Sequence, residues 1–145
     1  MKKVVFVCLG NICRSPMAEF VMKSLTDDYE IESRATSSWE HGNPIHKGTQ
    51  KIFKDHEIPY DSSKTSQQIS KDDSEYFDYV IGMDESNLLD LTRMCPQDQQ
   101  HKLEAFASEG VPDPWYTGDF DETYNRVLTG CQAWLARLEN ETKNG

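Results

Sequence analysis

The chain has 145 residues and a formal net charge of −10. Nucleic acids and anionic membranes attract basic surfaces, so this charge argues against either as the main partner, and we expect no nucleic-acid binding and no membrane insertion. The length suits one globular domain over residues 1–145, large enough to bury a core without disulfides or a structural metal.

The N-terminal segment and the cysteines indicate the cellular compartment of the protein. Its first apolar run, residues 4–7, is too short for a signal peptide or a membrane span. Four cysteines occur in a chain with no recognisable export signal, which favours reduced thiols over a disulfide framework. We therefore expect a cytoplasmic protein.

The first predicted element is a strand over residues 4–7, a β-branched and aromatic run typical of strands buried on both faces of a parallel sheet. The chain then turns over residues 8–15. Ser15 and Pro16 suit the N-cap and the first position of a helix, and Glu19 would then lie in its first turn. The order is strand, loop, helix.

Further elements follow in the same alternation. A weaker strand is predicted at 30–35, a surface loop at 36–47, a short helix at 48–56, and strands at 77–83 and 102–106. A helix should begin after Asp84, and an apolar stripe predicts a terminal helix over residues 119–140 that packs on the sheet. Residues 58–74 give no clear prediction.

This alternation predicts an α/β fold, a three-layer αβα sandwich with a central, mainly parallel four-stranded sheet. In such sheets ligands bind beyond the carboxyl ends of the strands. We expect a phosphate-binding loop there, after the first strand.

The loop over residues 8–15 has the composition of an anion site. Its backbone N–H groups and the start of the following helix can hold phosphate oxygens, and Arg14 adds a forked guanidinium. The same surroundings favour the thiolate form of Cys8, which would be a nucleophile beneath a bound phosphorus. The alternative is that Cys8 is only a small buried hydrophobe, the usual situation of an unpaired cysteine.

Residues 5–19, VFVCLGNICRSPMAE, closely resemble the signature of the low-molecular-weight protein tyrosine phosphatases. The likeness continues through residues 37–44, 83–87 and 113–116, in the order of that family and over nearly the whole chain. The resemblance implies hydrolysis of phosphotyrosine and other aryl phosphomonoesters through a phosphocysteine on Cys8. It implies that the enzyme needs no cofactor and no metal. The expected substrate is a phosphotyrosine-containing protein, and the enzyme is expected to be a monomer or weak dimer.

Asp113 is the expected proton donor and, later, the base. Taken alone, an Asp between two prolines is ordinary turn chemistry, and that alternative would be preferred without the resemblance. With Cys8 and Arg14, Asp113 completes the expected catalytic set.

The resemblance also assigns supporting roles. It gives Ser15 a hydrogen bond to the Cys8 sulfur, and it gives Asn11 a partner in Ser33. Aromatic and apolar side chains would form a deep slot for a phenyl ring. The residues expected to bind the phosphate or the ring are Leu9, Gly10, Asn11, Ile12, Cys13, Ser15, Trp39, Trp115 and Tyr116.

Three further expectations concern regulation and support of the loop. The resemblance allows a reversible disulfide between Cys8 and Cys13. Asp84 would orient Arg14 or the loop, unless it only caps a helix. A histidine that braces the loop in some family members is missing, and Lys64 is the candidate to replace it.

Three other functions fit the sequence less well. An arsenate reductase of related sequence would need a resolving cysteine pair, but Cys95 has no close partner and Cys131 lies on the predicted terminal helix. A related phosphoarginine phosphatase typically carries threonine at the position of Ile12, so the bulky isoleucine favours phosphotyrosine as the substrate. A non-enzymatic phosphate-binding module would leave the joint presence of Cys8, Arg14 and Asp113 unexplained.

Overall fold

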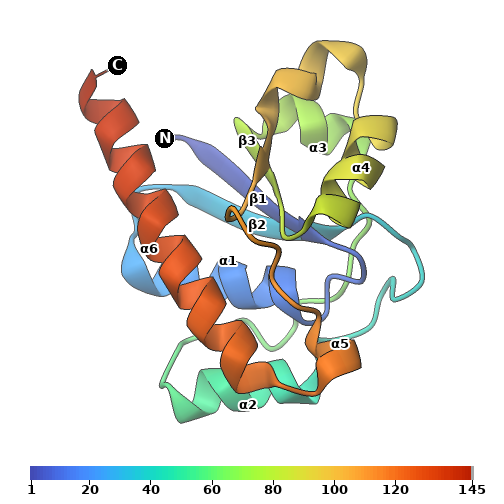
Figure 1. Cartoon of the computed structure of the whole chain (residues 1–145), viewed down its shortest axis with the longest axis vertical. Coiled ribbons are helices and arrows are strands. Elements are labelled where there is room, and N and C mark those ends of the chain that lie inside the picture. Colours follow the sequence, from blue (N-terminus) through green and yellow to red (C-terminus); the bar gives the residue numbers. More distant parts are fainter. Residues whose placement is uncertain (145) are drawn as a thin grey trace.

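The computed structural model describes residues 1–144 and has a parallel four-stranded sheet at its centre (Figure 1). The strand order is β2-β1-β3-β4, and all three neighbouring pairs are parallel, which confirms the predicted fold class. The strands are β1 (Lys3–Cys8), β2 (Glu30–Ala35), β3 (Tyr79–Gly82) and β4 (Leu103–Ala105).

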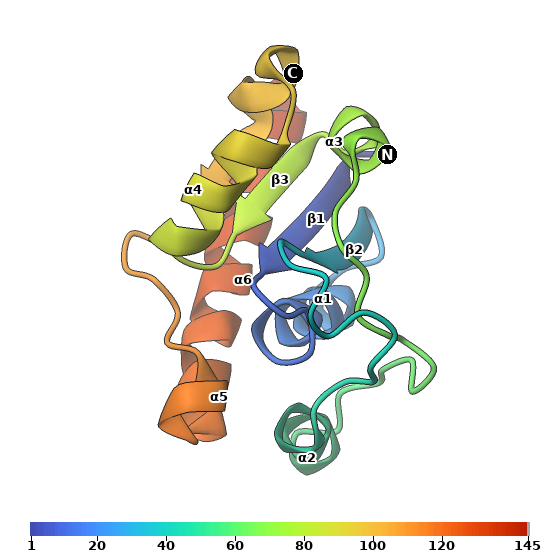
Figure 2. The same ribbon diagram turned by 90° about the vertical axis from the view of Figure 1, so that its right-hand side faces the viewer.

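Helices connect the strands and cover both faces of the sheet (Figure 1). Two of them, α2 and α5, lie at the same end of the molecule in both ribbon views (Figure 1, Figure 2). The helices are α1 (Arg14–Leu25), α2 (Lys47–Asp55), α3 (Lys71–Tyr76), α4 (Glu85–Met94), the 3-10 helix η1 (Gln97–Lys102), α5 (Pro114–Thr117) and α6 (Phe120–Asn144).

The central strand β1 separates two apolar cores. Successive side chains of a strand point to opposite faces of the sheet. Accordingly, Val4 and Phe6 belong to a large core with residues of α1, α2 and α6, whereas Val5 and Val7 belong to a smaller core with residues of α4. The continuous apolar run predicted a strand buried on both faces, which is confirmed. Packing on both faces fixes the position of β1 and therefore of Cys8 at its end.

The start of α1 differs from the prediction. The helix begins at Arg14 with Cys13 as its N-cap residue, and no side chain caps it. The prediction that Ser15 is the N-cap was wrong, because the Ser15 hydroxyl is used inside the preceding loop. Glu19 consequently lies beyond the first turn, and its buried carboxylate binds Ser33 of β2 instead of the helix start.

Two short α-helices were not predicted, and neither was the 3-10 helix η1. α3 has the polar sequence KDDSEY and no apolar periodicity, and it is defined by a capping box between Ser70 and Asp73. α5 has four residues and is capped by Asp113, whose side chain accepts from the Trp115 N–H. In contrast, α4 starts as predicted, with Asp84 as N-cap in a second capping box with Asn87.

The terminal helix α6 holds the segment that carries Asp113. Its predicted stripe is buried at Val127, Cys131, Trp134 and Leu138. Trp134 Nε1 donates to the Phe106 carbonyl at 2.9 Å. At Gly130 an added Cβ would lie 2.2 Å from the Phe106 ring, so only glycine permits this approach. The chain leaving β4 is thereby fixed against α6.

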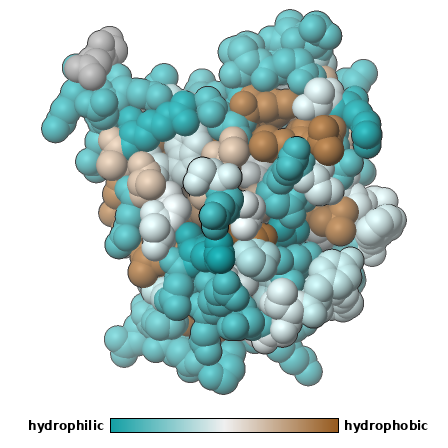
Figure 3. Space-filling model, in the orientation of Figure 1, coloured by the Kyte–Doolittle hydropathy of each residue, from teal (hydrophilic) through white to brown (hydrophobic). Residues whose placement is uncertain are grey.

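The face of the molecule in Figure 3 is mainly hydrophilic, as expected for a chain in which 28% of the residues are charged. Large exposed hydrophobic side chains include Trp39 from the loop after β2, and Trp115 and Tyr116 from α5. None of the helices within residues 1–144 combines the length and apolar character needed to span a bilayer.

Candidate active site

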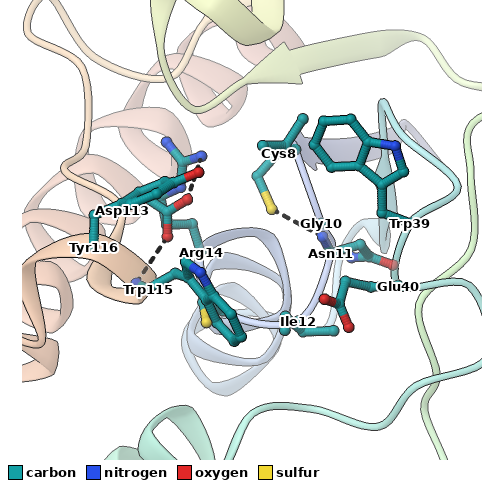
Figure 4. Close-up of a pocket in the computed structure, with 12 residues that line it drawn as sticks. Cys8, Gly10, Asn11, Ile12, Arg14, Trp39, Glu40, Asp113, Trp115 and Tyr116 are labelled. Atoms are coloured by element: carbon teal, nitrogen blue, oxygen red, sulfur yellow. Dashed lines mark hydrogen bonds and ion pairs between the residues drawn. The ribbon is translucent and has the colours of Figure 1, made fainter.

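The candidate site begins where β1 ends, at Cys8. The side chain is 3% exposed and lies at the base of a pocket of about 130 Å³, into which its sulfur points (Figure 4). The chain returns from Cys8 to the start of α1 within a few residues. This loop, residues 8–13, is called the phosphate loop below.

Two groups contact the Cys8 sulfur. The Asn11 backbone N–H donates to Sγ at 3.2 Å, and the Ser15 hydroxyl lies 3.1 Å from it. Asn11 adopts φ = 56°, a left-handed conformation that asparagine tolerates better than most residues. This turn brings the N–H back toward the sulfur, where both groups suit a thiolate acceptor.

The Asn11 side chain connects the loop to β2. Its Nδ2 donates to Ser15 Oγ at 2.8 Å and to Ser33 Oγ at 3.0 Å. Because Ser15 Oγ accepts from Asn11, its own proton can be donated to the Cys8 sulfur at 3.1 Å or to the Arg34 carbonyl at 3.4 Å. The predicted contacts of Ser15 with Cys8 and of Asn11 with Ser33 are confirmed.

A buried carboxylate completes this network. Ser33 Oγ donates to Glu19 Oε1 at 2.6 Å, and Lys64 Nζ lies 3.9 Å from the same oxygen and donates to the Ser33 carbonyl at 2.9 Å. Lys23 binds the other carboxylate oxygen at 2.7 Å. Burial lowers the pKa of Lys64, opposed by the neighbouring Glu19. Lys64 is therefore linked to the phosphate loop through Ser33, which binds Asn11.

Arg14 lies on the other side of the sulfur, 3% exposed. Its Nη1 donates to Asp84 Oδ2 at 2.6 Å and to the Val111 carbonyl at 3.0 Å. Burial acts to lower the pKa of Arg14, but Cys8, Asp84 and Asp113 together raise it above its ordinary value. Asp84 thus caps α4 and orients Arg14, so both predicted roles hold.

Asp113 faces the phosphate loop from the segment between β4 and α5 (Figure 4). Its Oδ1 accepts from the Trp115 N–H at 3.0 Å, and Oδ2 lies 3.5 Å from Arg14 Nη2. Upstream, the Val111 N–H donates to the Met83 carbonyl at 3.0 Å, which attaches the segment to the end of β3. Asp113 is therefore held across the pocket from Cys8 by backbone and side-chain bonds.

The pocket brings together segments that are far apart in the sequence. Every residue expected to bind phosphate or the ring lines it except Ser15, which is buried behind Cys8. The pocket also includes one residue that the sequence analysis left out, Glu40. Its lining consists of Cys8, Leu9, Gly10, Asn11, Ile12, Cys13, Arg14, Trp39, Glu40, Asp113, Trp115 and Tyr116.

Residues 3–144 match the family model described as low molecular weight phosphotyrosine protein phosphatase. The chain belongs to this phosphatase family. A relative in Staphylococcus aureus, the low molecular weight protein-tyrosine-phosphatase PtpA, is 44% identical over 141 residues, which cover 90% of each chain.

Several solved structures, one of them named as a member of this family, have the same fold. The low molecular weight protein tyrosine phosphatase SP-PTP from Streptococcus pyogenes superposes with a TM-score of 0.91 and 59% identity, covering 95% of this chain and 93% of its own. YfkJ from Bacillus subtilis gives a TM-score of 0.90 at 37% identity, covering 97% and 96%. An arginine phosphatase from Drosophila, DARP, gives 0.85 at 31% identity, covering 95% and 98%.

The other three cysteines differ in position, because Cys13 lies in the phosphate loop and lines the pocket, whereas Cys95 and Cys131 lie in the apolar cores. Burial, followed by the charges of Cys8 and Asp113, raises the pKa of the Cys13 thiol well above its ordinary value. Cys95 belongs to the small core and Cys131 to the large one, and burial raises the pKa of both. Neither lines the pocket, so neither is placed to resolve a bond on Cys8 as an arsenate reductase would require.

His46 is a supporting residue that the sequence analysis of this phosphatase did not identify. Its backbone N–H donates to the Ile12 carbonyl at 2.9 Å, and its Nδ1 accepts from the Gly48 N–H at 2.9 Å, which caps α2. The ring stacks on Phe120 and meets Trp115 edge to face. A lone histidine in a polar loop has no local pattern that reveals such contacts. Within residues 1–144, no three His, Cys, Asp or Glu side chains gather as a metal site would require.

Proposed function

We propose that this phosphatase hydrolyses phosphotyrosine in proteins through a phosphocysteine on Cys8, without a metal. The observation that supports this most is that one pocket holds the Cys8 sulfur at its base, Arg14 beside it and Asp113 opposite (Figure 4). A nucleophile, an anion-binding cation and a proton donor are the groups that phosphomonoester cleavage needs.

In the first step the Cys8 thiolate attacks phosphorus in line with the leaving oxygen. The S–P bond forms as the P–O bond to the tyrosine ring breaks. Asp113, entering as the carboxylic acid, gives its proton to the departing phenolate. Transfer of this kind contributes roughly 10²–10⁴ in rate.

In the second step water attacks the phosphorus of phosphocysteine. Asp113, now a carboxylate, accepts a proton from that water while the S–P bond breaks. Inorganic phosphate and the Cys8 thiolate are regenerated. The hydrogen bonds to the sulfur from Asn11 N–H and Ser15 then stabilise the leaving thiolate as they stabilise the resting one.

We assign charge stabilisation to Arg14 and to the N–H groups of the phosphate loop. Arg14 is already positioned by Asp84 and the Val111 carbonyl, so little reorganisation is needed when phosphate enters. Preorganised donors of this sort dominate catalysis of phosphoryl transfer. Leu9, Gly10 and Cys13 would contribute through their backbone.

Selectivity for an aromatic phosphoester is assigned to the walls of the pocket. Ile12 is buried at one wall, and Trp39, Trp115 and Tyr116 are exposed at the mouth. Flat side chains around the mouth favour a phenyl ring, because a short aliphatic phosphoester cannot make the same contacts with them.

We further propose that residues 1–145 form one phosphatase domain that acts as a monomer or weak dimer in the cytoplasm. The family model spans residues 3–144, which supports the single domain. Four free cysteines support a reducing compartment, because the reaction requires Cys8 as a thiolate.

The experiment compares hydrolysis of phosphotyrosine, phosphoserine and phosphoarginine peptides of one sequence in the presence of a chelator. We expect phosphotyrosine to be hydrolysed fastest, and Cys8→Ser to abolish the activity. Preference for phosphoarginine would move the chain toward the activity named for DARP. Activity that appears only after a divalent metal is added would contradict the mechanism.

A further inference from the structure

We infer that Glu40 gives the pocket a preference for phosphotyrosine flanked by Lys or Arg in the substrate chain. The inference rests on the proposed function, because it concerns the substrate of the same pocket. It names a specificity residue and the chemistry of the substrate segment that this residue contacts.

Glu40 lies at the mouth of the pocket, on the side opposite Asp113. Figure 4 shows its carboxylate near Ile12, with Trp39 above it and Asp113 across the opening. The side chain is half-buried. An added Cβ at Gly10 would lie 3.4 Å from Glu40 Cγ, so the stem of Glu40 packs against the phosphate loop.

The carboxylate is held in place. Asn43 Nδ2 donates to Glu40 Oε2 at 2.7 Å, and the Asn43 N–H donates to the Glu40 carbonyl at 2.8 Å. The same turn is attached to the loop through Ser66, which accepts from the Gly42 N–H and donates to the Gly10 carbonyl at 2.7 Å. A group ordered before binding loses little conformational entropy when a ligand contacts it.

The carboxylate is also uncompensated. Arg14 is the only Lys or Arg among the residues that line the pocket, and Asp84 and Asp113 already pair with it. No Lys, Arg or His among the described residues forms an ion pair with Glu40, whose one assigned side-chain partner is the neutral Asn43. The pocket therefore has a cation at its base that is already paired, and a carboxylate at its mouth that is not.

A bound phosphotyrosine would place its neighbours at this mouth. Successive residues of an extended chain are about 3.3–3.6 Å apart, so a flanking Lys or Arg reaches a carboxylate at the rim with its long side chain. Arg could bind the free Oε1 and stack on the Trp39 ring, which is 78% exposed. A flanking Glu would instead meet a fixed like charge.

The expected effect is moderate, because the contact stays partly in solvent. One such ion pair changes affinity by about two- to fivefold, and added salt reduces the change. The effect should fall on kcat/KM and KM more than on kcat, since the flanking residue contacts the protein equally before and during the reaction.

The test uses three phosphotyrosine peptides that differ only in the two flanking residues, which are Lys, Gln or Glu. We expect kcat/KM of the intact protein to fall in that order by about two- to fivefold a step, with smaller steps at high salt. Glu40→Gln should remove most of the difference between the Lys and Glu peptides. Glu40→Lys should reverse their order.

The control is Glu75→Gln, which removes the same charge from an exposed position on α3. It should keep the order and the ratios of the wild type, which separates a local contact from the net charge. Equal kcat/KM of the wild type for the three peptides, or a ratio between the Lys and Glu peptides that is as large in Glu40→Gln as in the wild type, would overturn the inference alone. Failure of the wild type to hydrolyse any of them would instead count against the proposed function.

Discussion

Arg14 Nη1 lies 2.6 Å from Asp84 Oδ2, which joins the first residue of α1 to the N-cap of α4 across the carboxyl edge of the sheet. Asp84 Oδ1 also accepts from the Asn87 N–H at 2.8 Å. One carboxylate therefore starts a helix with one oxygen and positions the phosphate-binding cation with the other.

Replacement of Asp84 should affect both roles. In Asp84→Ala we expect about a tenfold to hundredfold loss of kcat/KM, because a hydrogen bond between charged groups contributes about 1.5–3 kcal/mol. Loss of the cap should also lower the free energy of unfolding by about 0.5–2 kcal/mol. Steady-state kinetics and urea denaturation measure the two effects.

The matched control is Asp90→Ala on the same helix. Asp90 pairs only with Arg93 at 3.6 Å, on a largely exposed face. Such a pair contributes at most about 0.5 kcal/mol, so activity should be unchanged. Equal activity in Asp84→Ala and Asp90→Ala would show that the position of Arg14 does not depend on Asp84.

Lys64 and Lys23 give a second pair of variants, since both contact the Glu19 carboxylate. The Lys64 side chain is 14% exposed and also donates to the Ser33 carbonyl, whereas that of Lys23 is 43% exposed. We expect Lys64→Met to lower the free energy of unfolding by about 1–3 kcal/mol and to reduce kcat. Lys23→Met should lower the free energy of unfolding by about 0.5 kcal/mol or less. Similar losses in the two variants would contradict a specific role for Lys64.

Asn11 combines a left-handed backbone with a buried amide, and two substitutions separate these features. Asn11→Gly removes the amide but suits φ = 56°, whereas Asn11→Ala removes the amide and also resists that conformation. Both should lose activity, and the alanine variant should be less stable by a further 1–2 kcal/mol or so in urea denaturation.

Glu57 provides the control for backbone strain, because it has φ = 54° on the exposed surface at the end of α2. Glu57→Gly should stabilise the protein by up to about 1 kcal/mol and leave kcat/KM unchanged. Greater stability for Asn11→Ala than for Asn11→Gly would mean that the left-handed turn is not strained.

Alkylation tests the chemical difference among the four cysteines. Cys13, Cys95 and Cys131 have raised pKa values, mainly through burial, so they stay protonated at neutral pH in the folded state and become reactive only as the pH rises far above it. Iodoacetamide at pH 7 should therefore modify Cys8 first. Mass spectrometry of the digested protein identifies the site, and inorganic phosphate should slow the reaction.

Unfolding in urea provides the comparison. It removes the burial that raises the three pKa values, and all four thiols should then react at similar rates. Modification of Cys13 or Cys95 as fast as Cys8 in the folded protein would contradict the assignment of Cys8 as the reactive thiol.

The sequence predicted the fold through local patterns. The apolar run of β1, the stripe of α6 and the Asp84 cap each depend on residues close together in the chain, and each was confirmed. The short helices α3 and α5 were missed because capping defines them instead of apolar periodicity. Ser15 looked like an N-cap because the sequence does not show that its hydroxyl is engaged by Asn11 and Cys8.

The candidate site was predicted where motifs were specific and missed where contacts are long-range. The proposed partner Lys64 was found because the resemblance defined a position to be filled. His46 and Glu40 act through contacts between separate loops, and no spacing along the chain reports such contacts. Glu40 lay inside a recognised motif, beside Trp39, and its charge was the available signal.

The central claim is that a phosphoryl group passes through the Cys8 sulfur. The most direct measurement mixes Asp113→Ala rapidly with p-nitrophenyl phosphate, quenches with acid and maps the phosphoryl group by mass spectrometry. Because p-nitrophenolate is a good leaving group, the first step needs no proton from residue 113. Hydrolysis of phosphocysteine by water lacks its base in this variant, so phosphocysteine should accumulate on the peptide that contains Cys8. Release of p-nitrophenol with no phosphoryl group on Cys8, or with one on another residue, would contradict the account.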